Sequence, residues 1–223
     1  MKRFLRSLVD NADPNSLAAA MRRKRFRLFL ELLDDTAHTL NRPARILDVG
    51  GSETFWEVMG YASSEHHITL LNLSAFPTRH ERITSVAGDA RDMSQFSAGQ
   101  FDIVFSNSVI EHVGAFADQS RMASEIQRVA PRFLVQTPSF YFPLEPHFLF
   151  PFFHWLPRTL RTWLVKHFSL GWYERVADAQ EASRIVEGIR LMKRSELEML
   201  FPGASILSEK FLGLTKSYIV VKR

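Results

Sequence analysis

The chain has 223 residues, of which 46% are apolar and 23% are charged, and its formal net charge is +4. These values are ordinary for a soluble globular protein with a sizeable core, and the length fits one domain with an insertion or a cap. The mild positive charge does not indicate a nucleic-acid binder, so no nucleic-acid partner is expected. The absence of cysteine excludes disulfides, thiolate metal sites and cysteine nucleophiles.

The N-terminal region reads as a helix without a targeting signal. The apolar part of residues 1–10 is too short and too interrupted for a signal peptide. No charge-free apolar stretch reaches the about 18 residues that suggest a membrane span, so a cytoplasmic protein is expected. Residues 14–38 follow the periodicity of an amphipathic helix. Its basic face either meets solvent or contacts anionic lipid.

The most informative segment is residues 45–52. An apolar run reaches Asp48, and Gly50, Gly51 and Ser52 follow. This pattern predicts a buried strand that runs into a tight turn, where glycines let the backbone approach a ligand. Alone the signal is weak, because many strand–turn–helix units share it.

Three further apolar runs also end in polar residues. They are residues 68–72, 83–89 and 101–107, and their last residues are Asn72, Asp89 and Asn107. Asn72 lies 24 residues past Asp48, near the offset of about 20 at which nucleotide-binding α/β units place a ribose ligand. Because ligands of an open α/β sheet bind beyond the carboxyl ends of its strands, the four ends are expected to converge on one crevice.

The rest of this region continues the alternation of strands and helices, which predicts a parallel sheet. A helix with a buried stripe at Met122, Ile126 and Val129 precedes a fifth strand at residues 133–137. Pro138 closes that strand.

Residues 138–190 do not continue the alternation of strands and helices. Twelve of the 27 aromatic residues lie between Phe140 and Tyr173, and five prolines between positions 138 and 157 forbid a regular helix there. A short amphipathic helix is expected at residues 158–168. We interpret the segment as an insertion that forms a lid or a wall for the substrate.

The C-terminal part returns to regular structure. Residues 191–200 are expected to form the last helix. Residues 204–211 and 216–222 are expected to form an antiparallel strand pair at the edge of the sheet.

At this point the residues resemble a known family. Residues 44–137 look like a class I S-adenosylmethionine-dependent methyltransferase of the small bacterial type, related to ubiquinone and other O-methyltransferases. The matching motifs are Asp-Val-Gly-Gly at 48–51, the adenine-contacting Gly-Asp-Ala at 88–90, Phe-Asp-Ile-Val at 101–104 and Glu-His-Val at 111–113.

The resemblance, with the pattern of elements, implies an α/β fold of the Rossmann-like three-layer type. Its sheet has seven mostly parallel strands with an antiparallel C-terminal strand, and the aromatic-rich insertion follows the fifth strand. The expected parts are a helical cap at 1–40, the cofactor-binding part at 41–138, the lid at 139–190, and the last helix and edge strands at 191–223.

Two positions depart from the family pattern. The family usually has a further glycine where this chain has Ser52, and an acidic residue where it has Asn72. Serine is small enough for a close turn. An amide still bonds ribose hydroxyls, but more weakly than a carboxylate, so a modest affinity is expected. A chain that keeps the fold without the activity is the alternative.

The resemblance assigns roles around the cofactor S-adenosylmethionine. Gly50, Gly51 and Ser52 would let the backbone approach it, and Asp48 would fix its methionine end directly or through water. Asn72 would bind the ribose, Asp89 and Ala90 the adenine, and Asn107 and Ser108 the methionine end. For Asp48 and Asp89, turn capping is the alternative role.

Candidate catalytic residues lie in two places. His112 is the first candidate base, with a structural role for its loop as the alternative. Glu145 and His147 are the second, because a carboxylate and an imidazole inside an apolar insertion resemble the perturbed pairs of active sites. An anchor that pins the lid is the alternative there. In some relatives an acidic residue at the position of Glu111 helps to hold a divalent metal, but one Glu-His pair does not establish such a site, and no metal site is expected here.

The leading hypothesis is an S-adenosylmethionine-dependent methyltransferase that methylates an oxygen of a small hydrophobic or lipid-linked acceptor. Peripheral contact with the inner membrane face is a further expectation. Two alternatives stay open: a non-catalytic S-adenosylmethionine-binding regulatory or scaffold module, and a nicotinamide-dependent oxidoreductase. The second lacks the full Gly-x-Gly-x-x-Gly pattern in residues 50–55.

Overall fold

The computed structural model describes residues 17–223. The start of the helix expected from residue 14, and the N-terminal segment that precedes it, lie outside the described residues. No helix of the described part combines the length and the apolar character that crossing a bilayer requires.

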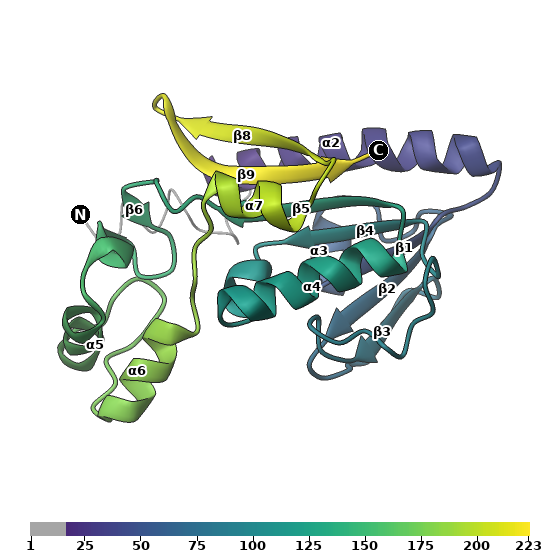
Figure 1. Cartoon of the computed structure of the whole chain (residues 1–223). Coiled ribbons are helices and arrows are strands. Elements are labelled where there is room, and N and C mark those ends of the chain that lie inside the picture. Colours follow the sequence, from purple (N-terminus) through teal and green to yellow (C-terminus); the bar gives the residue numbers. More distant parts are fainter. Residues whose placement is uncertain (1–16) are drawn as a thin grey trace.

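One seven-stranded sheet organises the molecule, in the order β3-β2-β1-β4-β5-β9-β8 (Figure 1). The strands are β1 (Arg45–Val49), β2 (His67–Asn72), β3 (Ile83–Ala87), β4 (Ile103–Asn107), β5 (Arg132–Pro138), β8 (Ser205–Phe211) and β9 (Leu214–Lys222). β1 to β5 are parallel, and β9 runs antiparallel between β5 and β8. The predicted fold class is therefore confirmed. The strand order changes direction between β1 and β4, the kind of switch point at which α/β folds bind ligands.

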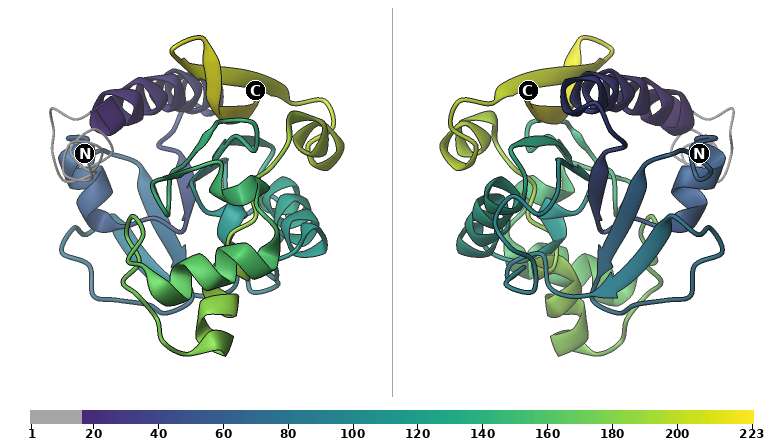
Figure 2. Two further views of the ribbon diagram at one scale, coloured as in Figure 1. Left: turned by 90° about the vertical axis from the view of Figure 1, so that its left-hand side faces the viewer. Right: turned by 90° about the vertical axis from the view of Figure 1, so that its right-hand side faces the viewer.

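Helices cover both faces of this sheet, as Figure 2 shows for α2 and α4. Helices α2 (Leu17–Leu40) and α3 (Glu53–Val58) cover one face, and α4 (Phe116–Val129) and α7 (Arg194–Leu200) cover the other. Successive residues of β1 point to opposite faces of the sheet. Ile46 therefore packs in the core beneath α2 and α3, and Leu47 packs in the core beneath α4 and α7. A 3₁₀ turn, η1 (Ile110–His112), leads from β4 towards α4.

The lid, residues 139–190, is a separate layer at one end of the sheet (Figure 1). It contains the hairpin β6 (Leu144–Glu145) and β7 (Phe150–Pro151), the 3₁₀ turn η2 (Phe153–Trp155), and helices α5 (Arg158–His167) and α6 (Ala179–Glu187). Its own core consists of Phe148, Phe153, Val165, Leu170, Ala182 and Val186.

Helix α6 is one part of the lid that the sequence analysis missed, as it also missed the β6–β7 hairpin and η2. Asp178 caps it by accepting a hydrogen bond from the Glu181 amide at 2.7 Å, and Ala182 and Val186 share its buried face. The Asp cap and the i, i+4 apolar pair were the available signals.

Candidate active site

The turn after β1 has no room for side chains. Gly50 has a φ of +74°, and a Cβ added to it would lie 2.5 Å from the Val109 Cγ2. A Cβ added to Gly51 would overlap the carboxylate of Asp48. The Gly50 amide donates to the Leu71 carbonyl at 2.8 Å, which ties the turn to β2. The turn is thus fixed as bare backbone.

A cavity of about 260 Å³ lies beside this turn, beyond the carboxyl ends of β1 to β4. We call it the cofactor cavity. Five predicted site residues line it: Gly50, Asn72, Asp89, Ala90 and His112. The ends of β1, β2 and β3 therefore converge on this cavity as expected from the sequence, whereas after β4 it is lined by Val109 and His112 and not by Asn107.

Asn72 has a specific contact within this cavity. Its Nδ2 donates to the Gly51 carbonyl at 2.9 Å, which joins the end of β2 to the glycine turn. The side-chain oxygen of Asn72 is then the atom left to accept from a ligand hydroxyl. A carboxylate could not donate to Gly51, so the unusual amide serves the turn as well as the cavity.

Asp89 is held by its neighbour Arg91. The Arg91 Nε lies 2.9 Å and 3.0 Å from the two carboxylate oxygens, and the Arg91 amide donates to Oδ1 at 2.8 Å. These hydrogen bonds with Arg91 lower the pKa of Asp89. Asp89 is therefore a fixed anion whose remaining lone pairs can accept from a ligand.

Asp48 and Ser52 lie behind the turn rather than on the cavity wall. The carboxylate of Asp48 is buried and accepts from the indole Nε1 of Trp56 at 2.8 Å. Burial raises its pKa to about 7. Ser52 is the N-cap of α3, and its hydroxyl accepts from the Phe55 amide at 3.3 Å. Both side chains brace the turn.

A second cavity, of about 180 Å³, lies between the sheet and the lid. We call it the acceptor cavity. Its polar lining includes Ser108, Gln136, His147 and Lys216, and its apolar lining includes Phe142, Leu144 and Trp172. Ser108 lines this cavity and the next residue, Val109, lines the cofactor cavity, so the two cavities adjoin at the end of β4.

His147 lines the acceptor cavity and forms a fixed pair with Glu145, which is not part of the cavity lining. Glu145 is buried, and its Oε1 lies 2.7 Å from the Nδ1 of His147. Its other oxygen accepts from the amides of His147 at 2.7 Å and Phe148 at 2.6 Å. Burial alone would lower the pKa of His147, but the hydrogen bond and charge of Glu145 outweigh it and raise that pKa. The carboxylate thus orients the ring, and Nε2 is the nitrogen left for a ligand.

His112 lies beside this pair at the boundary of the two cavities. Its ring contacts that of His147 edge to face, with centroids 4.7 Å apart. The residue as a whole is exposed, yet partial burial of its side chain and the neighbouring His147 lower its pKa to about 4. His154 does not join the group, because its Nε2 lies 2.8 Å from the Phe140 carbonyl oxygen. The two places proposed for catalytic residues are therefore one cluster.

Sequence reasoning missed Arg25, which comes from α2. This buried residue donates to the Oδ1 of Asn107 at 2.8 Å and lies 3.5 Å from the carboxylate of Glu209. It also lines the acceptor cavity. Its position four residues before Phe29 on the buried face of α2 was the available signal.

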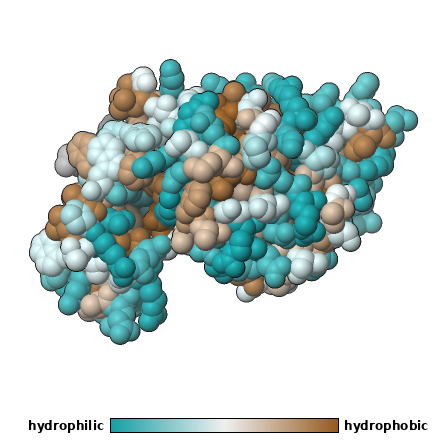
Figure 3. Space-filling view, viewed as in Figure 1, coloured by the Kyte–Doolittle hydropathy of each residue, from teal (hydrophilic) through white to brown (hydrophobic). Residues whose placement is uncertain are grey.

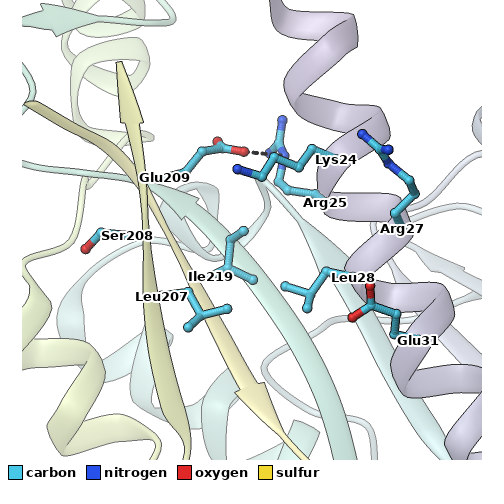
Figure 4. Close-up of a pocket in the computed structure, with 9 residues that line it drawn as sticks. All are labelled: Lys24, Arg25, Arg27, Leu28, Glu31, Leu207, Ser208, Glu209 and Ile219. Atoms are coloured by element: carbon cyan, nitrogen blue, oxygen red, sulfur yellow. Dashed lines mark ion pairs between the residues drawn. The ribbon is translucent and has the colours of Figure 1, made fainter. Parts of the chain in front are cut away.

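A larger groove of about 530 Å³ lies between α2 and the β8–β9 pair (Figure 4). Leu28, Leu207 and Ile219 point toward one another across it. Arg25 and Glu209 line both this groove and the acceptor cavity. Their ion pair therefore stands where the two spaces meet.

Comparison with known proteins identifies the central part of the chain. Residues 42–132 match a protein family described as "Methyltransferase domain". No curated protein matches the chain in sequence.

Solved structures share the fold at low sequence identity. A protein from Pyrococcus horikoshii OT3 is 18% identical, with 99% of this chain and 98% of that one covered and a TM-score of 0.53. WbdD is 14% identical, with 88% of this chain and 40% of WbdD covered and a TM-score of 0.53. A Rhodobacter sphaeroides protein named for Zn-dependent alcohol dehydrogenases is 10% identical, with 85% and 87% covered and a TM-score of 0.51. The chain spans less than half of WbdD, and these likenesses show the fold alone.

Proposed function

The chain is a class I S-adenosylmethionine-dependent methyltransferase, as predicted from its sequence, and from this premise we propose that it methylates an oxygen atom of a small hydrophobic or lipid-linked acceptor. The observation that carries the proposal is His147, which lines the acceptor cavity and is held by the buried carboxylate of Glu145. An oxygen nucleophile needs a group that removes its proton, and a carboxylate-oriented imidazole is suited to that task.

The residues of the cofactor cavity fit S-adenosylmethionine. The bare turn at Gly50 permits close approach, the side-chain oxygen of Asn72 can accept from a ribose hydroxyl, and Asp89 is an anion that can accept from an amino group. When bound, the cofactor supplies a methyl group already activated on a sulfonium. The protein then has to align an acceptor, exclude water and remove a proton.

His147 is positioned to accept the proton that the acceptor hydroxyl loses. Its Nδ1 donates to Glu145, so its Nε2 can accept the proton of an acceptor hydroxyl in the cavity. The carboxylate then stabilises the imidazolium, as the raised pKa of His147 indicates. Glu145 is itself held by two backbone amides, so the ring keeps its orientation during transfer.

The apolar character of the acceptor is inferred from the walls around this pair. Phe142, Leu144 and Trp172 line the cavity, and Leu28 and Ile219 line the groove beyond the Arg25–Glu209 ion pair. An acceptor with a hydroxyl at one end and an apolar chain at the other would fit both spaces. Lys216 also lines the acceptor cavity, and burial lowers its pKa.

The acceptor class is tested by following a labelled methyl group. Purified protein is incubated with methyl-labelled S-adenosylmethionine and with separate lipid and small-molecule extracts, and mass spectrometry locates the label. We expect an ether or ester in the lipid fraction, and none with His147→Ala. A label on nitrogen or sulfur would contradict oxygen transfer. Cofactor binding without transfer to any extract would favour the non-catalytic module.

We also propose that the lid rests on an anionic membrane surface. Five of its aromatic side chains are between 45% and 50% exposed: Phe152, Trp155, Trp163, Phe168 and Trp172. Such rings favour the membrane interface, and Lys166 and Arg175 in the same segment add positive charge. This contact would bring a lipid-linked acceptor to the enzyme.

Vesicle sedimentation tests the membrane contact. We expect weak binding to anionic vesicles that salt reduces, because the charge contribution is screened. Trp163→Ser should weaken it by roughly 1 kcal/mol. Leu212→Ser is the matched control, since Leu212 is 85% exposed in the β8–β9 turn, outside the lid. Equal weakening by both variants would contradict a lid-specific contact.

A further inference from the structure

Three potential metal ligands meet where the cofactor and acceptor cavities adjoin. Glu111 and His112 belong to η1, and His147 belongs to the lid. One ligand atom from each lies within 4.8 Å of the others. Ligand atoms on a tetrahedral zinc ion lie about 3.4 Å apart, so an ion would draw the three side chains together from nearby positions.

The carboxylate of Glu111 is only half satisfied. Glu111 is fully buried, and its Oε2 accepts from the Thr137 hydroxyl at 2.9 Å. Its Oε1 is also buried and has no hydrogen-bond partner among the described residues. A buried carboxylate oxygen without a hydrogen-bond partner lowers the stability of the folded state. A cation held at this oxygen would remove that destabilisation.

Both histidines have the supporting contacts that metal-binding histidines show. His147 donates its Nδ1 proton to Glu145, which leaves the Nε2 lone pair available. His112 offers one ring nitrogen within 4.8 Å of the other two ligand atoms, and the backbone of Gly188 interacts with its side chain. A carboxylate or carbonyl behind a ligating imidazole fixes its tautomer and raises its basicity.

A second cluster of similar composition shows what is special about the first. Glu53, Glu57 and His80 also lie within ligand distance of one another. There the carboxylates are already satisfied, because Arg79 contacts both and the His80 amide donates to Glu53 at 2.9 Å. That cluster is an ion-pair network, whereas Glu111 keeps an unused oxygen.

We propose that Glu111, His112 and His147 bind a divalent transition-metal ion of the zinc class. Two imidazoles and one carboxylate suit first-row transition ions, with further positions left for water or substrate. The site is assembled from η1 and the lid, so an ion there also joins the lid to the sheet. This goes beyond the metal-free site expected from the sequence.

A metal ion bound at this site would affect methyl transfer, a consequence that rests on the proposed function. His147 has one free lone pair, at Nε2, because Glu145 engages Nδ1. A metal ion and an acceptor proton therefore compete for the same nitrogen. Bound zinc should inhibit methyl transfer, and a chelator should restore it.

The test begins with metal alone, without any acceptor. Cobalt(II) is titrated into the full chain and its visible absorption bands are followed, with calorimetry for zinc(II). We expect one ion per chain and a loss of affinity of at least about tenfold in Glu111→Gln, His112→Ala and His147→Ala. His80→Ala is the matched control from the second cluster and should bind as the wild type does. Equal binding by all variants, or no binding by the wild type, would overturn the site.

The competition is tested separately, as the ratio of methyl transfer with and without zinc. A ratio well below one in the wild type and near one in Glu111→Gln would support it. A ratio above one would overturn the competition and the role of His147 as base, while leaving the metal site established by its spectrum. Failure to find any acceptor would count against the proposed function, and the metal titration would still decide the site.

Discussion

The two cavities are built in different ways. The cofactor cavity consists of strand ends that follow one another along the chain, and its turn is fixed by backbone that admits no side chains. The acceptor cavity collects residues from α2, β5, the lid and β9. The first can be deduced from local sequence, whereas the second depends on how distant segments pack. Substitutions in the two should therefore affect different steps.

The largest effect is expected on the acceptor side. His147→Ala should reduce turnover by about 10²–10⁴-fold, because it removes the group that accepts the proton, and should leave S-adenosylmethionine affinity unchanged. Glu145→Gln should reduce turnover less, since the ring remains. Turnover by single-turnover kinetics and affinity by calorimetry separate the two. His154→Ala is the control, because that histidine bonds the Phe140 carbonyl away from the cavity. Wild-type turnover in His147→Ala would reduce the pair to an anchor of the lid.

At the glycine turn, the expected effect is on cofactor binding. Gly50→Val should abolish measurable cofactor binding, because the new side chain would meet Val109 at a position that already has a positive φ. Gly60→Val is a matched control with a φ of +71° and nothing within 4 Å of an added Cβ. It imposes a similar backbone strain without the clash. If both folded variants bind equally well, the turn does not hold the cofactor.

Asn72 gives a smaller and sharper test. Asn72→Leu should weaken cofactor binding by about 1–3 kcal/mol, because ribose hydroxyls lose their acceptor. From the family pattern alone, Asn72→Asp should restore affinity. The structure predicts the opposite, since a carboxylate would face the Gly51 carbonyl at the position where Nδ2 now donates. Calorimetry on both variants decides it, and tighter binding by Asn72→Asp would mean that the Gly51 contact is dispensable.

The smallest effect is expected on the pH dependence of stability. Burial raises the pKa of Asp48 to about 7, so the folded state keeps a proton that the unfolded chain releases above about pH 4. The stability this gives is present below the unfolded pKa and is lost as pH rises through about 7. Asp48→Asn should make the fall between about pH 4 and about pH 7 shallower in urea unfolding. An unchanged slope would assign the fall to other groups, of which Glu111, with its pKa also raised to about 7 by burial, is the first.

The same contrast explains what the sequence could and could not predict. Asn72, Asp89 and the glycines follow apolar runs, so period and spacing place them. Arg25 could not be placed in the site by local pattern, because its partners Asn107 and Glu209 lie 82 and 184 positions away. The cluster of Glu111, His112 and His147 was missed for a related reason.

In that cluster, Glu111 and His112 are neighbours in the sequence, but His147 comes from the lid. The three side chains are close together only because of how the lid folds against the sheet. No spacing rule covers such a meeting, and the half-satisfied carboxylate of Glu111 is visible only once Thr137 has been placed.

The position of β9 has a consequence for the order of assembly. β8 precedes β9 in the chain, yet within the described residues its only partner in the sheet is β9, which lies between it and β5. β8 therefore has nothing to pair with while β9 is still being synthesised. Lys216 and Ser217 of β9 and Glu209 of β8 form one wall of the acceptor cavity. A nascent chain would thus complete its cofactor strands first and gain a closed acceptor cavity only when this hairpin docks.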